Sequence, residues 1–434
     1  MYINYDLITL IMTSITGVMI AFVLLMSIYY LIYWSVSARK TEPVPHSDKL
    51  TKFAVLIAAR NESKVISHIL ESLKKQTYPA DSFEVYVIVE KESDPTVEIV
   101  KSFGYKYFVR DRLMDGRRTK GFALQECIDY FWRNEIEFDS YMIFDADNIL
   151  EERYLEVMND LRQTGVRVGL GFRNFTNANT NWLTIGSSVM FAYMNDVTSK
   201  GRSIVFHKAT LMGTGYYVDD VIIKDAGGWI FTGMTEDIQL TSYCYYHDIH
   251  MRYYPLVCFY DEQSADFKTV HAQHVRWLAG YFEKRKFLKK AGIQHNYHSS
   301  GMLSFMNFEF NYGLIPFIIF NVVMSIGAIV DLVFASIGTF YVGPEHYGLL
   351  FGLAAFQFLL VYASFALPAF ITILRANDRI NLTTKNKIIG VLTYIFFFYE
   401  FALAFIDGTL HPKKKTTWTR VKHTGEVTNT AIKK

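Results

Sequence analysis

Long stretches without charge constrain this chain more than any other feature of its sequence. They are residues 7–34, 313–340, 347–374 and 388–406. The first and third carry no charged side chain, and the other two carry one acid each, Asp331 and Glu400. Because ~20 consecutive apolar residues suffice to cross a bilayer as a helix, the sequence predicts a membrane protein with four membrane segments.

The first apolar stretch is expected to be a signal anchor that stays in the protein. It is longer than the apolar core of a cleaved signal, and no small-residue cleavage site follows it. Arg39 and Lys40 come directly after it, while residues 1–6 contain no basic side chain, so the positive-inside rule places the next region in the cytoplasm. The three cysteines are few, odd in number and without metal-type spacing, as in a reducing compartment. The formal net charge of +2 does not indicate a nucleic-acid-binding protein.

Between the first two apolar stretches, β-rich runs alternate with helical patterns. The expected strands lie within residues 52–60, 83–90, 105–111, 141–147 and 166–174, and the expected helices within 63–76, 97–103 and 121–132. This alternation predicts an α/β domain with a mostly parallel sheet covered on both faces. Ligands of such a sheet bind outside the carboxyl ends of its strands, where this chain places Arg60, Glu62, Glu90, Asp145 and Asp147.

Two acids one residue apart, Asp145 and Asp147, end the strand-like run YMIFDAD. Two carboxylates held close together repel each other unless a cation or a proton lies beside them. Mg²⁺ binds one or two carboxylates together with the oxygens of a substrate diphosphate. The pattern indicates either such a metal site or a solvated turn.

A second cluster lies in GGWIFTGMTEDIQLTSY, residues 227–243. Thr235 is expected to cap a helix, which puts Glu236 and Asp237 in its first turn, where the helix dipole favours anions. Either this dipole accounts for the two acids, or one of them is a general base, since a positioned carboxylate can take a proton from a sugar hydroxyl.

A third cluster lies in HAQHVRWLAGYF, residues 271–282. On a helix, Gln273, Arg276 and Trp277 share one face. That face combines an amide, a guanidinium able to hold phosphate through two hydrogen bonds, and an indole platform. Trp277 is equally well explained as an anchor at the membrane interface. His271 and His274 do not have the spacing of a metal site and receive no role.

In this order, and flanked by apolar segments, the D-x-D, T-E-D and Q-x-x-R-W motifs resemble the membrane-integrated family 2 glycosyltransferases. These are the inverting, processive synthases of cellulose, chitin, hyaluronan and poly-N-acetylglucosamine. The similarity covers residues 52–282 and includes GTGYYV and GGW between the first two motifs. It implies a GT-A fold, a UDP-sugar donor (UDP-glucose or UDP-N-acetylglucosamine first), a growing glycan acceptor, and Mg²⁺ or Mn²⁺. An accessory export subunit is a further expected partner.

Carried over position by position, the resemblance implies donor-binding roles for one group of residues. They are Ala58, Arg60, Glu62, Glu90, Lys120, Asp145, Gln273 and Arg276. Asp145 and Asp147 would hold the metal ion, with Asp147 the more direct ligand. Members of the family usually carry an aspartate against the uracil; this chain offers Glu90, the better positional match, or Asp94.

The resemblance also implies residues for catalysis and for the acceptor. Asp237 is expected to be the general base that deprotonates the acceptor hydroxyl, with Glu236 beside it. Trp277 is expected to stack beneath the acceptor sugar, with Thr235 on the same side.

The expected domain order places the enzyme in the plasma membrane. It is an anchor at 1–38, a cytoplasmic GT-A domain at 48–282, interfacial helices at 283–312, membrane segments at 313–410 and a basic tail at 411–434. Three crossings after the cytoplasmic domain would put that basic tail outside, against the positive-inside rule. Residues 388–406 are therefore expected to be re-entrant, or one apolar region to cross differently. Asp331 and Glu400 are expected either to line an exit channel or to pair with another helix.

Two other functions fit parts of the sequence. A glycosyltransferase that adds a single sugar to a lipid, of the ceramide glucosyltransferase type, has similar D-x-D and R-W motifs. An inactive scaffold of a secretion complex is a third reading, which the three intact motifs disfavour.

Overall fold

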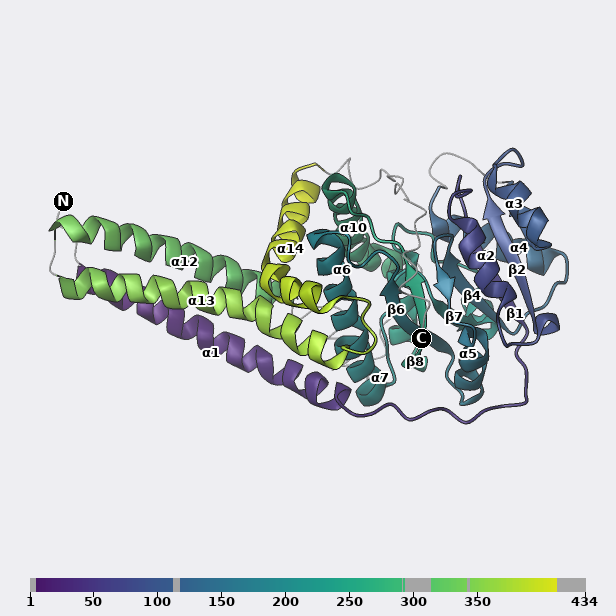
Figure 1. Cartoon of the computed structure of the whole chain (residues 1–434), viewed down its shortest axis with the longest axis horizontal. Coiled ribbons are helices and arrows are strands. Elements are labelled where there is room, and N and C mark those ends of the chain that lie inside the picture. Colours follow the sequence, from purple (N-terminus) through teal and green to yellow (C-terminus); the bar gives the residue numbers. More distant parts are fainter. Residues whose placement is uncertain (1–4, 112–117, 291, 293–313, 342–343, 412–434) are drawn as a thin grey trace.

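The computed structural model consists of a sheet-containing domain and a set of long apolar helices (Figure 1). It describes residues 5–111, 118–290, 292, 314–341 and 344–411. Helix α1 (Tyr5–Ser37) precedes the domain, and α12 (Leu314–Tyr341), α13 (Pro344–Arg375) and α14 (Thr384–Leu410) follow it. Residues 293–312 of the expected interfacial helices and almost all of the basic tail lie outside the described residues.

One eight-stranded sheet has the order β3-β2-β1-β4-β7-β6-β8-β5. Its strands are β1 Phe53–Ala58, β2 Phe83–Val89, β3 Lys106–Val109, β4 Ser140–Asp145, β5 Ile149–Leu150, β6 Val168–Phe175, β7 Tyr216–Asp219 and β8 Met251–Asp261. Parallel pairing joins β1 to β2 and β4, β2 to β3, and β6 to β8. The mostly parallel sheet is therefore confirmed. Strand β7 is antiparallel to both β4 and β6, and the edge strand β5 is antiparallel to β8, which the sequence did not predict.

Helices cover both faces of this sheet, as predicted. They are α2 Ile66–Lys74, α3 Thr96–Phe103, α4 Lys120–Arg133, α5 Tyr154–Gln163, α6 Trp182–Tyr193, α7 Lys200–Phe206, α8 Asp220–Asp225, α9 Glu236–Tyr246 and α10 Phe267–Lys290, with a 3-10 helix at Ala80–Ser82 and a π-helix at Met194–Ser199 between α6 and α7. Side chains alternate across a strand. Val55 of β1 accordingly belongs to the same core as Ile69 of α2, while its neighbour Leu56 belongs to the core of Leu124 of α4.

Helix α10 is one continuous helix that carries both the Q-x-x-R-W motif and the basic run at residues 283–290. The domain boundary expected near residue 283 is therefore not a break in the structure. Residues 283–290, the start of the expected interfacial segment, form the last two turns of α10.

Two glycines allow the motif segments to approach one another. A Cβ on Gly280 of α10 would collide with the side chain of Thr235, and a Cβ on Gly121 of α4 would collide with the backbone at Phe231 and Thr232. Both contacts join parts of the chain that carry sequence motifs. The absence of a side chain at these positions therefore sets how closely the motifs can pack.

Three described helical stretches are long and apolar enough to cross a membrane: Phe320–Ile337, Tyr347–Arg375 and Thr384–Gly408. They indicate that the chain is integrated in a membrane. In Figure 1, α1, α12 and α13 run alongside one another away from the sheet domain, whereas α14 runs across the domain end of that group. Contacts of α14 with α6, α10 and α13 agree with this view.

Both ends of α14 contact the sheet domain. At its start, the amide of Thr383 donates to Asn179 Oδ1 (2.9 Å). Near its end, Asp407 Oδ2 lies 3.2 Å from His271 Nε2 of α10. A helix of 27 residues is about 40 Å long, so a crossing would separate these ends by the whole bilayer. Helix α14 therefore lies along the domain.

Replacing Gly280 with alanine is expected to destabilise the protein by about 1–3 kcal/mol, because the added methyl group overpacks the α9–α10 contact. Thermal unfolding of the purified protein measures the effect. The double variant Gly280→Ala with Thr235→Ser should recover part of the loss, because it removes one of the colliding atoms. Unchanged stability of the single variant would mean that α10 does not pack this closely on Thr235.

Candidate active site

The D-x-D motif is tied to the glycine-containing turn before β7. The amide of Asp145 donates to Asn148 Oδ1 (3.1 Å) and to Thr214 Oγ1 (2.9 Å). Thr214 also donates to Asn148. Since Ala58, the last residue of β1, pairs in register with Asp145, the loop after β1 begins beside this turn. The polar residues at the ends of β1 and β4 therefore share one edge of the sheet.

Lys120 brings the D-x-D and T-E-D motifs together. Its Nζ lies 2.5 Å from Asp145 Oδ1 and 2.8 Å from the carbonyl oxygen of Gly213. Burial alone would lower the pKa of Lys120, but the nearby Asp145, Glu236 and Asp237 raise it above its ordinary value. One ammonium group is thus shared by acids from two separate motifs.

The two acids of T-E-D are buried at the start of α9. Burial raises the pKa of Glu236 to about 7, although Lys120 acts to lower it. Burial also raises the pKa of Asp237, opposed by the backbone amides of Ile238 and Gly213 and by Lys120 and Arg276. Asp237 therefore has more groups that stabilise its anion than Glu236 has, and the third motif reaches it through Arg276.

Thr235 occupies the N-cap position of α9, as predicted, but its hydroxyl makes no capping hydrogen bond. Among the described residues this buried hydroxyl has no hydrogen-bond partner. Its side chain instead packs against Gly280. The capping part of the prediction is wrong because the side chain is turned toward α10.

A third acid, Asp261 at the end of β8, lies beside the D-x-D motif. Burial, Asp261 and Asp145 all raise the pKa of Asp147. Arg173 of β6 balances part of this charge, since its Nε donates to Asp261 Oδ2 (2.9 Å). Such crowding of carboxylates favours a bound cation, so these residues fit a divalent metal ion.

Asp261 and Arg173 were not among the predicted site residues. Like Asp145, Asp261 is a polar residue at the end of a strand. The sequence pattern does not predict β8, so it does not mark Asp261 as a strand-end residue.

The loop after β1 shows which of two acids is engaged by the backbone. The carboxylate of Asp94 accepts hydrogen bonds from the amides of Asn61 (2.8 Å) and Thr96 (2.9 Å) and therefore shapes the loop. Glu90 instead forms an ion pair with Arg60, with Nε and Oε2 3.0 Å apart. Unlike Asp94, Glu90 is held only through side chains among the described residues. Breaking its ion pair with Arg60 would leave its carboxylate available to a nucleotide.

Glu62 of the same loop is held at its backbone. Its amide donates to Thr96 Oγ1 (3.0 Å) at the start of α3. The loop that carries Arg60 and Glu62 is thus fixed to the segment after β2.

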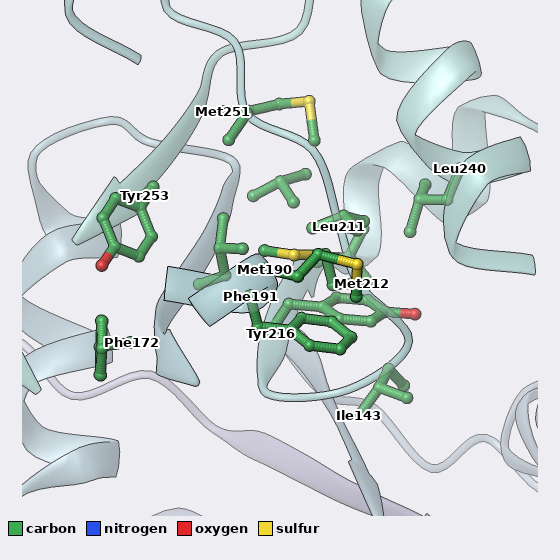
Figure 2. Close-up of a cluster of buried hydrophobic side chains, with 14 of the residues drawn as sticks. Ile143, Phe172, Met190, Phe191, Leu211, Met212, Tyr216, Leu240, Met251 and Tyr253 are labelled. Carbon is green, nitrogen blue, oxygen red and sulfur yellow. The ribbon is translucent and has the colours of Figure 1, made fainter. Parts of the chain in front are cut away.

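Trp277 of the third motif is half-buried on α10 with its edge toward Phe191 of α6, the ring centroids 6.1 Å apart. Gln273 and Arg276 are half-buried on the same helix. Figure 2 shows Phe191 beside Met190, Met212 and Tyr216 in the apolar core, against which Trp277 packs. The platform predicted for the acceptor thus rests on the apolar core.

The fold and the three converging motifs define a class of protein. Residues 51–280, more than half of the chain, match the family model described as "Glycosyltransferase like family 2". The chain belongs to this family, and the predicted family is confirmed.

Curated relatives differ in what their names say they make. "Probable glycosyltransferase YdaM" of Bacillus subtilis is 30% identical over 54% of this chain and 56% of its own length. "Beta-monoglucosyldiacylglycerol synthase" of Trichormus variabilis is 25% identical over 53% and 49%. "Poly-beta-1,6-N-acetyl-D-glucosamine synthase" of Staphylococcus epidermidis is 23% identical over 60% and 65%. The chain thus spans about half to two thirds of the length of these relatives.

A solved structure supports the predicted GT-A fold. The mannosyltransferase PcManGT from Pyrobaculum calidifontis, solved in complex with GDP-Man and Mn²⁺, is 15% identical with a TM-score of 0.55. The similarity covers 94% of this chain and 100% of that chain. The fold prediction is confirmed, and at this identity the likeness concerns the fold alone.

Replacing Lys120 with methionine removes the cation that the acids share and is expected to destabilise the protein by about 1–3 kcal/mol. An acid whose pKa is higher in the folded than in the unfolded protein makes the folded state less stable as the pH rises from the unfolded pKa to the folded pKa. Lys120 lowers the folded pKa of Glu236. Without Lys120, the loss of folding stability therefore continues to a higher pH. The deficit should therefore be larger near about pH 8 than near about pH 5.5, as measured by denaturant unfolding.

The matched control for this variant is Lys75→Met. Lys75 forms an exposed ion pair with Glu71 (3.0 Å), so its loss should cost at most about 1 kcal/mol. Equal deficits for Lys120→Met at both pH values would show that Lys120 does not compensate the buried acids.

Proposed function

We propose that this protein is an inverting glycosyltransferase that moves a hexose from a UDP-sugar, UDP-glucose or UDP-N-acetylglucosamine, to an acceptor hydroxyl at the cytoplasmic face of the plasma membrane. One observation carries the proposal. Lys120 interacts electrostatically with Asp145 of D-x-D and with Asp237 of T-E-D, and Arg276 of Q-x-x-R-W interacts with Asp237. This grouping of two cations with a buried carboxylate supports a site for a nucleotide sugar and an acceptor hydroxyl.

In the proposed reaction, Asp237 takes the proton of the acceptor hydroxyl. The oxygen then forms a bond to the anomeric carbon as the bond to the UDP oxygen breaks, so a single displacement inverts that carbon. Arg276 and Lys120 balance the charge of the departing diphosphate. A divalent cation, Mg²⁺ or Mn²⁺, held by Asp147 and Asp145 would supply further charge neutralisation. No protein nucleophile takes part.

The other donor and acceptor residues are assigned by position. Glu90, after exchange of its ion pair with Arg60, is proposed to accept a hydrogen bond from the base. Gln273 is proposed to contact the diphosphate, and Trp277 with Thr235 to contact the acceptor sugar.

Replacing Asp237 with asparagine is expected to lower transfer by about 10²–10⁴-fold, because the base is lost while its shape remains. UDP affinity should change little, since the cations remain. UDP release from a panel of UDP-sugars, together with UDP binding, measures both effects. Asp147→Ala serves as the donor-side control and Asp225→Asn, at the exposed end of α8, as the neutral one. Normal turnover of Asp237→Asn would assign the base to another residue.

The first proposed acceptor is a growing β-linked glycan that is exported as it is made. The packing between α1, α12 and α13 limits where such a glycan could cross the membrane. Asp331 and Gln357 are buried between α12 and α13, and Gln357 Nε2 donates to Thr16 Oγ1 of α1 (2.8 Å). Neighbouring helices normally pack about 8–10 Å apart with side chains filling the space between them. Export would therefore use a route formed with an accessory subunit or a second copy.

The same observation favours a second acceptor, a membrane lipid that receives one sugar. Such an acceptor needs no route through the bilayer, only access from its cytoplasmic surface. Incubation of membranes with a radiolabelled UDP-sugar separates the two candidates. Label in high-mass material identifies the polymer, and label in the chloroform phase identifies the lipid.

We also propose that α1, α12 and α13 cross the membrane and that α14 lies at its cytoplasmic surface. Three crossings place the basic tail on the side of the catalytic domain, in agreement with the positive-inside rule.

A fluorescent protein fused to the C-terminus is therefore expected to fluoresce, and an alkaline phosphatase fused there to be inactive. Phosphatase inserted between α12 and α13 should be active and serves as the control. An active C-terminal phosphatase would show that α14 crosses.

A further inference from the structure

A cluster of titratable side chains joins α10, which carries the Q-x-x-R-W motif, to the apolar helix α14. His271 and His274 belong to α10, and Glu400 and Asp407 belong to α14. His271 Nδ1 lies 2.9 Å from Glu400 Oε1, and His271 Nε2 lies 3.2 Å from Asp407 Oδ2. His274 Nδ1 bonds to the other carboxylate oxygen of Glu400. Of the two alternatives for Glu400, pairing with another helix is therefore the one observed.

The contacts engage three imidazole nitrogens. Both nitrogens of His271 face carboxylate oxygens, and an ionised carboxylate only accepts hydrogen bonds. Burial lowers the pKa of His274, whose Nδ1 faces Glu400. Both oxygens of Glu400 are thereby engaged by α10, and Glu400 and His274 are each 2% exposed.

His274 also connects Glu400 to the third motif. Its ring stacks on Phe401 of α14, with centroids 3.7 Å apart and planes 17° apart. On the same helix it contacts Trp277, with centroids 5.1 Å apart. Phe191 contacts Trp277 from α6. The indole is thus held by His274 and Phe191.

Such a cluster specifies geometry more than it adds stability. Buried ion pairs are often no more stabilising than apolar side chains of the same size. A hydrogen-bonded pair, however, is satisfied in only one arrangement. Successive residues of a helix are about 100° apart around its axis, so a small rotation of α10 would remove His274 from Glu400 and turn Trp277 away from its present contacts.

Helix α14 also carries exposed apolar side chains. They are Ile388, Leu392, Phe396, Leu403 and Leu410. On a helix, Phe396 and Leu403 lie within one turn of Glu400 and on neighbouring positions of its surface. The exposed apolar strip of α14 therefore runs beside the carboxylate that holds α10.

We propose that His274 and Glu400 are positioning residues for the acceptor side of the site. Through them α14 fixes the rotation of α10 and the orientation of Trp277. The inference rests on the proposed function for the role of Trp277 as the acceptor platform. It assigns to α14 a part in acceptor use, because the membrane-facing helix and the platform are joined by His274.

The test uses native membrane vesicles that contain the full-length protein as wild type, His274→Phe, Glu400→Gln or the double variant. His274→Phe keeps an aromatic ring but loses the hydrogen bond, and Glu400→Gln keeps a carbonyl acceptor for one imidazole. We expect each single variant to lower transfer to endogenous acceptor by about tenfold, as for the loss of about 1.4 kcal/mol. We expect UDP release by hydrolysis without transfer, and the UDP dissociation constant, to stay within about twofold.

The double variant should lose no more than the worse single variant, because both substitutions break one pair. His68→Gln and Glu71→Gln on α2 are the matched controls, since they change the same residue types on a helix outside the cluster. Thermal unfolding and UDP binding identify any variant that has lost its fold. Glu400→Gln, the milder change, is the second variant if His274→Phe fails to fold.

Three outcomes are distinguishable. Loss of transfer with intact UDP binding supports positioning by the pair. Transfer equal to wild type, or UDP binding and transfer falling in parallel in folded protein, overturns it. If wild type neither hydrolyses nor transfers from any UDP-sugar, the proposed function fails instead.

Discussion

Repulsion between closely spaced acids is the constraint on which the active site depends. Asp145, Glu236 and Asp237 lie close enough to affect one ammonium group, that of Lys120. At such distances, like charges in a medium of low dielectric constant oppose folding unless cations or protons accompany them. The chain supplies Lys120 and Arg276 for this purpose and places Arg173 on Asp261. The same excess of negative charge prepares the edge of the sheet for a divalent cation and the diphosphate that it accompanies.

Much of the fold follows from local sequence patterns. The five predicted strands correspond to β1, β2, β3, β4 and β6, because each is an apolar run bounded by polar residues. Strand β7 is only 4 residues long, and β8 contains Pro255, which weakens a strand pattern. Their pairing is decided by tertiary contacts that a local pattern does not contain.

The site was predictable to a similar degree. The order of the three motifs indicates the residues that converge, and the structure brings Asp145, Lys120, Asp237 and Arg276 together. Asp261 required knowledge of the register between β6 and β8. The partner of His274 is 126 residues further along the chain, so the spacing of the histidines on their own helix contained no sign of it.

The attachment of α14 at both ends has a mechanical consequence. A helix held to the domain at two points cannot tilt relative to it as it could on a single tether. In the proposed arrangement, with α14 at the membrane surface, the two attachments would hold the reaction centre at a fixed height above the bilayer. Acceptors would then be selected by how far their reactive hydroxyl projects from the membrane as well as by their chemistry.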